Sequence, residues 1–213
     1  MKALILLAGP LLLGSELLRA ASQARLVIAA DRGILHAEAL GVRPHLWVGD
    51  FDSTDADLLV RWRDVPREWH PRDKDATDAE LAVRAALRLG ARKLLIVGAL
   101  GGEPDHELAH HALAITLAEA GHDPVLTDGR CAALPVVPPG RSVALQRGTR
   151  FSLIPLDHLT RVDLEGARWT LAGEAIPLGS TRATRNLATG RVRIRLASGR
   201  AILVACPPGG ALA

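Results

Sequence analysis

Short apolar runs alternate with helical patterns along the chain up to about residue 128. Five runs are continuous stretches of apolar side chains, which is typical of strands buried on both faces of a sheet. Two longer segments, Asp78–Leu89 and Asp105–Ala120, place apolar residues at helical spacing, and a glycine follows each. This alternation predicts an α/β fold with a mostly parallel, doubly wound sheet. The expected strands are Ala3–Ala8, Leu26–Ala30, Leu46–Val48, Leu94–Val97 and Val125–Thr127.

The pattern changes after residue 130, where no helical stretch of useful length follows. Segments with strand character replace it, and residues 191–196 alternate strictly between arginine and apolar side chains, as a half-buried antiparallel strand does. Pro135, Pro138, Pro139 and Gly140 mark the junction. We therefore expect an α/β domain over residues 1–130 and a smaller all-β domain over residues 131–213. The strands expected in the second domain are Ser142–Leu145, Phe151–Ile154, Arg161–Leu164, Arg168–Leu171, Val192–Leu196 and Ala201–Ala205.

The composition narrows the functional classes. Hydrophobic residues make up 48% of the chain, which is enough for a sizeable core. Only 3% of the residues are aromatic and none is Tyr, so a surface for stacking on nucleic-acid bases is not expected. The two cysteines, Cys131 and Cys206, have no metal or redox spacing, and we expect them to be reduced, as in the cytoplasm.

The apolar N-terminus has two interpretations. Met1-Lys2 and the run after it resemble a signal peptide, but Gly9-Pro10 would break a helical segment at that point. A buried first strand therefore fits better. No run of about 18 apolar residues occurs, so no membrane span is expected.

Carboxylates occur where an open parallel sheet binds its ligands, at the carboxyl ends of the strands. Four separate strand-end loops each deliver a carboxylate beside glycine or lysine. Such carboxylates repel one another unless a cation lies among them, and hard oxygen ligands favour Mg²⁺. Mg²⁺ held in this way usually accompanies nucleotide phosphates, which glycine N–H groups and Lys74 would contact. The carboxylates are Asp31, Asp50, Asp52, Asp78 and Asp105.

Three local motifs allow more than one interpretation. Residues 77–80 fit a helix capping box, which favours a structural role for Thr77 and Glu80. Residues 50–54 match the nucleophile loop of haloacid-dehalogenase-like phosphatases, but those enzymes carry it on their first strand and here it follows the third. His106 and His110 have the H-E-x-x-H spacing of zinc proteases, and without a further metalloprotease framework a chance match is favoured.

Four ordered elements resemble those of thiamine diphosphokinases (thiamine pyrophosphokinases). The Gly-Asp-Phe-Asp-Ser signature is intact at residues 49–53, and the Lys-Asp-x-Thr-Asp-x-Glu element is intact at residues 74–80. Residues 30–33 and 101–106 match in part the family's Ala-Asp-Gly-Gly and Gly-Gly-Arg-x-Asp-His elements. Segments of the second half, beginning at Phe151 and Gly166, extend the resemblance over nearly the whole chain.

The resemblance implies a catalytic α/β domain followed by a β-sandwich, in a cytoplasmic homodimer that binds thiamine near the subunit interface. The implied reaction transfers the terminal pyrophosphoryl unit of ATP to the thiamine hydroxyl and releases AMP, with Mg²⁺ neutralising the triphosphate. The implied metal ligands are Asp50, Asp52 and Asp78, and the implied catalytic set adds Lys74 and Asp105. The implied ATP contacts are Asp31, Arg32, Gly33, Lys74, Thr77, Gly101 and Gly102. The implied thiamine contacts are Trp169, Thr184 and Asn186; for Trp169, a place in the core stays open as an alternative.

Three positions depart from the family pattern. Glu103 stands where the family usually has arginine, and Arg32 replaces a glycine. We hypothesise that Arg32 supplies the positive charge missing at position 103. Arg185-Asn186 stands where the family has Ser-Asn in its thiamine site.

Three other functions stay open from the sequence. The acidic loops would also suit a pyrophosphokinase for another heterocyclic alcohol, such as a hydroxymethylpterin. The H-E-x-x-H match would suit a zinc hydrolase. A nucleotide-binding regulator without catalysis is the third possibility.

Overall fold

The structure, a computed structural model, describes residues 1–52, 54–71 and 75–207. Six strands of the first half pair in parallel, and they include all five strands expected there. The six are β1 (Lys2–Leu6), β2 (Leu26–Ala30), β3 (Leu46–Gly49), β4 (Arg67–Trp69), β5 (Lys93–Val97) and β6 (Asp123–Thr127). Their order across the sheet is β6-β5-β1-β2-β3-β4.

The apolar N-terminal run forms β1, a central strand between β2 and β5. Residues 3–6 are fully buried, and Ile5 is aligned with Ile28 on one side and Ile96 on the other. The prediction of a buried first strand is therefore confirmed. None of the helices in the described ranges has the length and hydropathy of a membrane span.

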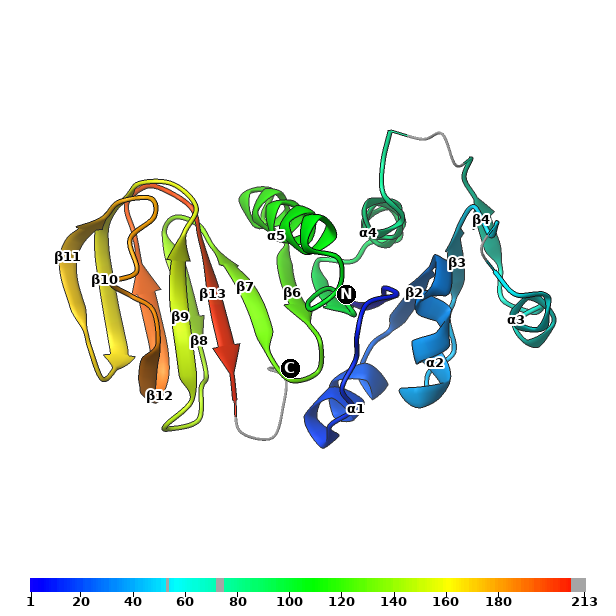
Figure 1. Cartoon of the computed structure of the whole chain (residues 1–213), viewed down its shortest axis with the longest axis horizontal. Helices are drawn as coiled ribbons and strands as arrows, with labels where there is room; N and C mark the ends of the chain where they lie inside the picture. Colours follow the sequence, from blue (N-terminus) through cyan, green and yellow to red (C-terminus); the bar gives the residue numbers. More distant parts are fainter. Residues whose placement is uncertain (53, 72–74, 208–213) are drawn as a thin grey trace.

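Helices pack on both faces of the parallel strands (Figure 1). Buried side chains of α4 and α5 form one apolar cluster with β1, β2 and β5, while α1, α2 and α3 contribute to a second cluster with the alternate residues of the same strands. A 3₁₀ turn, η1 (Asp31–Ile34), links β2 to α2. The helices are α1 (Ser15–Ser22), α2 (Leu35–Ala39), α3 (Ala56–Arg61), α4 (Asp78–Arg88) and α5 (Pro104–Glu119).

The second half consists of antiparallel strands that share a separate apolar cluster. They are β7 (Ala132–Val136), β8 (Gly140–Val143), β9 (Arg150–Pro155), β10 (Leu159–Ala167), β11 (Leu171–Ile176), β12 (Asn186–Arg195) and β13 (Ala201–Cys206). Strand β7 pairs with β6, so the two halves form one 13-stranded sheet in the order β11-β10-β12-β9-β13-β7-β6-β5-β1-β2-β3-β4, with β8 on β12. The mixed α/β class is confirmed, and the sheet runs continuously from one half into the other.

Two expectations for the second half differ from the structure. The expected strand Arg168–Leu171 is mostly a turn, because the side-chain amide of Asn186 binds the backbone of Trp169 where a strand partner would be needed. Pro135 lies within β7 instead of at a junction. Proline is tolerated there because β6 pairs only with Ala132 and Ala133, so no partner on that side requires an N–H from Pro135.

The expectation of two reduced cysteines is wrong for this structure, in which Cys131 and Cys206 form a disulfide. Cys131 directly precedes β7 and Cys206 ends β13, and these antiparallel strands align Ala132 with Ala205. This register brings the two Cα atoms to 4.2 Å across a sequence separation of 75 residues. The pairing therefore follows from the alignment of β7 with β13, which the spacing of the two cysteines in the sequence does not reveal.

The disulfide generates a stability prediction. Closing a loop of this length constrains the unfolded chain, so Cys131→Ser should lower the free energy of unfolding by about 2–4 kcal/mol. Urea denaturation of the oxidised protein and the variant measures the difference. Reductant should produce the same loss in the parent protein and none in Cys131→Ser. Two free thiols per chain in the untreated, denatured protein would contradict the pairing.

Candidate active site

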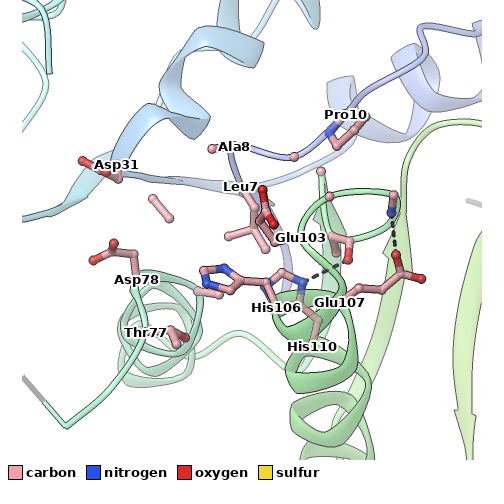
Figure 2. A pocket seen from close by; sticks show the side chains of 17 residues that line it. Leu7, Ala8, Pro10, Asp31, Thr77, Asp78, Glu103, His106, Glu107 and His110 are labelled. Atoms are coloured by element: carbon pink, nitrogen blue, oxygen red, sulfur yellow. Dashed lines mark hydrogen bonds between the residues drawn. The ribbon is translucent and has the colours of Figure 1, made fainter. Parts of the chain in front are cut away.

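A pocket of about 590 Å³ lies at the carboxyl ends of the central parallel strands (Figure 2). The segments after β1, β2 and β5 form its floor, and the N-terminal ends of α4 and α5 form its sides. Figure 2 shows Asp31 and Asp78 on one side, and Glu103 and Glu107 on the other. This is the edge at which the sequence predicted a ligand site.

Close approach of two strand-end loops shapes the floor of the pocket. A Cβ atom added to Gly9 would lie 2.2 Å from the carbonyl oxygen of Gly98, and one added to Gly98 would lie 2.3 Å from that of Leu7. Gly98 also has a φ of +70°, which side chains rarely adopt. Only glycine therefore lets the segments after β1 and β5 touch here.

Asp31 enters the pocket directly after β2. Its φ is +45°, and its carbonyl oxygen accepts a hydrogen bond from Trp47 Nε1 at 2.8 Å, which fixes the turn against the buried indole of β3. A Cβ atom added to Gly49 would lie 3.1 Å from Asp31 Oδ1, so the end of β3 lies against this carboxylate. Of the predicted ATP contacts beside it, Arg32 is exposed and Gly33 is buried against the carbonyl of Leu6; neither lines the pocket.

Thr77 and Asp78 reach the pocket from the start of α4. Thr77 is the N-cap residue, and its Oγ1 accepts a hydrogen bond from Glu80 N at 3.3 Å, as the capping motif predicted. The carboxylate of Glu80 pairs with Arg84 one turn further along. Asp78 is the first helical residue and lines the pocket. Lys74, predicted to contact phosphate, lies outside the described residues.

Asp50 and Asp52 follow β3 but do not line this pocket. Asp50 Oδ1 accepts a hydrogen bond from Asp52 N at 3.0 Å, and Asp52 is exposed. Phe51, at a φ of +61°, places its ring edge-on against Trp47, with 5.0 Å between centroids. The contact of Phe51 with Trp47 therefore anchors the loop that carries Asp50 and Asp52. This loop follows the end of β3, which lies against Asp31.

The loop from Gly101 to Glu103 forms the other side. Gly101 N donates to Glu107 Oε2 at 2.7 Å, so this backbone donor is already engaged by a helix carboxylate. Gly102 and Glu103 also line the pocket, and Glu103 is the N-cap residue of α5. Asp105 is exposed and outside the lining, and its Oδ1 accepts a hydrogen bond from His106 N at 2.9 Å.

His106 and His110 line the pocket, a role that the sequence analysis missed. The nitrogen Nδ1 of His110 donates to the carbonyl oxygen of Ala99 at 2.9 Å, which leaves Nε2 as the acceptor when the ring is neutral. Burial lowers the pKa of His110, and the bond to Ala99 offsets this only in part. The i, i+4 spacing of the two histidines places them on one face of α5 and is the signal in the sequence for this role.

The pocket is acidic. Its described lining residues include four carboxylates, from Asp31, Asp78, Glu103 and Glu107, and no Lys or Arg. No three His, Cys, Asp or Glu side chains in residues 1–52, 54–71 and 75–207 are grouped as a preformed metal site. The zinc-protease alternative gains no support from these residues, because the Glu107 carboxylate is held by the backbone N–H of Gly101.

A second pocket, of about 460 Å³, lies in the antiparallel half around Trp169 and Asn186. The side chain of Asn186 is buried and binds both backbone polar groups of Trp169, at 3.1 and 2.7 Å. Trp169 itself is 55% exposed, with the guanidinium of Arg168 5.0 Å from its ring centroid, so it is not a core residue. Thr184 lies outside this lining, and its Oγ1 donates to the carbonyl oxygen of Thr181.

The two half-buried imidazoles of α5 predict a pH dependence of stability. Burial lowers the pKa of both His110 and His111 below 6.5, so the unfolded chain binds these protons at a higher pH than the folded chain. The free energy of unfolding should therefore fall as the pH drops below about 6.5. Urea denaturation at pH 7.5 and 5.5 should show a smaller difference in His110→Gln than in the parent. His158→Gln, at an exposed turn, is the control, and an unchanged difference in His110→Gln would refute the assignment.

Similar folds occur in solved structures of one enzyme family. The thiamine pyrophosphokinase of Bacillus subtilis is 24% identical, with a TM-score of 0.87 over 97% of this chain and 99% of its own. That of Geobacillus thermodenitrificans is 25% identical, with a TM-score of 0.83 over 100% of both chains. The yeast thiamin pyrophosphokinase is 14% identical, with a TM-score of 0.81 over 97% of this chain and 86% of its own. No curated protein sequence is a significant match.

The family model for the catalytic domain of thiamin pyrophosphokinase matches residues 17–123, about half of the chain. The matched region contains Asp31, Asp50, Asp52, Asp78 and Asp105, together with most of the strands and helices that build the first pocket. The chain therefore belongs to the thiamin pyrophosphokinase family, whose members are ATP-dependent diphosphotransferases.

Proposed function

We propose that this enzyme transfers the pyrophosphoryl group of ATP to the hydroxyl of thiamine, giving thiamine diphosphate and AMP, as a homodimer. The observation that carries the proposal is the acidic pocket at the carboxyl ends of the parallel strands. A triphosphate is itself an anion, so it would enter a pocket lined by four carboxylates only together with cations. That requirement is typical of sites that handle metal-bound nucleotides.

The donor set fits Mg²⁺. This ion usually binds through one or two protein carboxylates together with substrate phosphates, so no preformed three-ligand cluster is needed. We propose that Asp78, which lines the pocket, would hold it together with Asp50 and Asp52, whose loop follows the end of β3 beside Asp31. Lys74 would contact phosphate oxygens. When bound, the metal would neutralise charge on the transferring phosphoryl groups.

The chain's own residues would position the reactants. The thiamine oxygen forms a bond to the β-phosphorus, the bond from that phosphorus to the oxygen bridging to the α-phosphate breaks, and AMP leaves. Of the two carboxylates proposed for nucleotide contact or proton uptake, Asp31 lines the pocket and is the better candidate, since Asp105 lies outside it. Thr77, Gly101 and Gly102 would contact the nucleotide from the two sides.

We assign thiamine to the antiparallel half, residues 131–213, which we interpret as the sandwich domain. The exposed ring of Trp169 already attracts one cation, the guanidinium of Arg168. The cationic thiazolium of thiamine would make the same kind of contact with the ring face. Asn186 would act by holding the turn that carries Trp169.

The two pockets of one chain are far apart, which supports a dimer. Strand β10, next to Trp169, is six strands away from β5 in the sheet order, or roughly 29 Å along the sheet at ~4.8 Å per strand. Figure 1 shows β10 and β11 at one end of the molecule, away from α4 and β2. We therefore propose that the Trp169 pocket of one subunit completes the acidic pocket of the other.

The reaction is tested by measuring AMP released from ATP and Mg²⁺ with and without thiamine. We expect thiamine-dependent AMP, and a loss of about 100-fold or more in turnover for Asp78→Asn, because Asp78 carries one of the proposed metal contacts. Asp64→Asn, which alters an exposed carboxylate near Arg43 and Arg63, is the matched control and should retain activity.

Release of AMP only with another alcohol, such as a hydroxymethylpterin, would keep the reaction type and refute the thiamine assignment. Binding of ATP and Mg²⁺ without AMP release from any acceptor would indicate a regulator. Equal turnover of Asp78→Asn and Asp64→Asn would remove Asp78 from the site.

The shared active site predicts complementation between two impaired variants. Asp78→Asn lacks a functional acidic pocket, and Trp169→Ala should bind thiamine about tenfold more weakly. When the two are co-expressed in equal amounts, half of the dimers contain one subunit of each kind and one intact pair of pockets. Activity at low thiamine should then reach about a quarter of that of the parent protein.

Activity equal to the mean of the two separate variants would show that each chain uses its own pockets. A monomer in sedimentation analysis at the assay concentration would contradict the dimer directly.

A further inference from the structure

A third pocket, of about 370 Å³, lies at the amino-terminal edge of the parallel strands, opposite to the acidic pocket. Its walls come from both halves of the chain, namely the starts of β1, β5 and β6, the end of α1, and strands β7 and β8. On this face of the sheet, the pocket lies between the end of helix α1 and strand β8. None of its lining residues belongs to the site proposed for ATP or thiamine.

A polar row crosses the sheet at this pocket. Lys2 of β1 is aligned with Lys93 of β5, and Lys93 is aligned with Asp123 of β6. Aligned residues of neighbouring parallel strands project from the same face, so the three side chains lie side by side. Two residues further along the strands, Leu95 and Val125 form an apolar wall on the same face.

Arg141 of β8 closes the far side of the row. Its guanidinium forms an ion pair with Asp123 and donates to the carbonyl oxygen of Pro135 at 3.3 Å. Only 18% of its side chain is exposed. The single carboxylate of the pocket is therefore already paired, and Arg141 is fixed in place by β6 and β7.

The remaining charge is positive and uncompensated within the described lining. Lys2, Lys93 and Arg141 are three cationic side chains against one carboxylate there. Burial lowers the pKa of Lys2, and the positive charges of Arg19 and Lys93 lower it further.

We propose that this pocket is a second binding site, for a small molecule that carries a phosphate or diphosphate group. The ammonium groups of Lys2 and Lys93 each offer three donors to phosphate oxygens, and Ser142 and Gln23 add neutral polar groups. The volume lies within the range of small-molecule pockets, and Leu95, Val125 and Val143 would contact an apolar body. A ligand here touches both halves of the chain, so it would stiffen the junction between them.

Calorimetric titration of inorganic pyrophosphate into the full-length protein in EDTA tests the site. EDTA removes divalent cations, so the acidic pocket would repel the probe. We expect measurable binding to the parent protein and an affinity about tenfold lower in Lys93→Gln, which removes one charge-assisted contact. Arg92→Gln removes the same charge from an exposed neighbour outside the lining and should bind within about twofold of the parent.

A second variant guards against misfolding as the cause of any loss. Ser142→Ala, on β8, should weaken binding without altering the thermal unfolding of the free protein. Asp78→Asn should bind pyrophosphate as the parent does, which separates this site from the proposed reaction.

Displacement of pyrophosphate by AMP or thiamine diphosphate would identify a product of the enzyme's own reaction as the occupant, whereas binding without such displacement indicates another phosphorylated compound. No binding to the parent, or equal binding to Lys93→Gln and the parent, overturns the proposal.

Discussion

The parallel pairing of β1 with β2 and β5 is the constraint on which the rest of the structure depends. These strands are buried on both faces, so their backbone polar groups must be satisfied by one another, and the resulting ladder turns every carboxyl end to the same edge. The segments after β1 and β5 then meet through Gly9 and Gly98. The pocket is the space that this contact leaves between the ends of α4 and α5.

Placing several carboxylates at that edge has an electrostatic cost, because like charges repel one another. Glu107 binds Gly101 N, and Thr77 caps the helix that presents Asp78. Asp31 and Asp78 line the pocket from the end of β2 and the start of α4. Cations that arrive with the substrate would balance the negative charge of this pocket. Burial lowers the pKa of the half-buried His110, so its imidazole is less readily protonated than an exposed one.

The sheet continues from one half of the chain into the other through β6 and β7. The acidic pocket lies in the parallel half, and the Trp169 pocket lies in the antiparallel half. Among the described lining residues, the acidic pocket has no exposed aromatic ring, whereas the Trp169 pocket has two arginines and no carboxylate. The two pockets therefore differ in their chemistry, and the sheet order keeps them apart within a chain. The proposed pairing of pockets between subunits follows from this separation. The cationic pocket lies where the pairing of β6 with β7 joins the two halves.

The sequence by itself determined the parallel strands, the two longer helices, the cap at Thr77 and the strand-end position of the acidic residues, because each depends on local periodicity or on chain direction. The short helices α1 to α3 and the edge strand β4 escaped prediction, since their patterns are too brief to stand out from loops. Only the tertiary structure decided that Cys131 meets Cys206, that Trp169 is exposed, that Asp105 lies outside the pocket and that His110 lines it. Those outcomes depend on strand register and on contacts between residues far apart in the sequence, which local patterns do not encode.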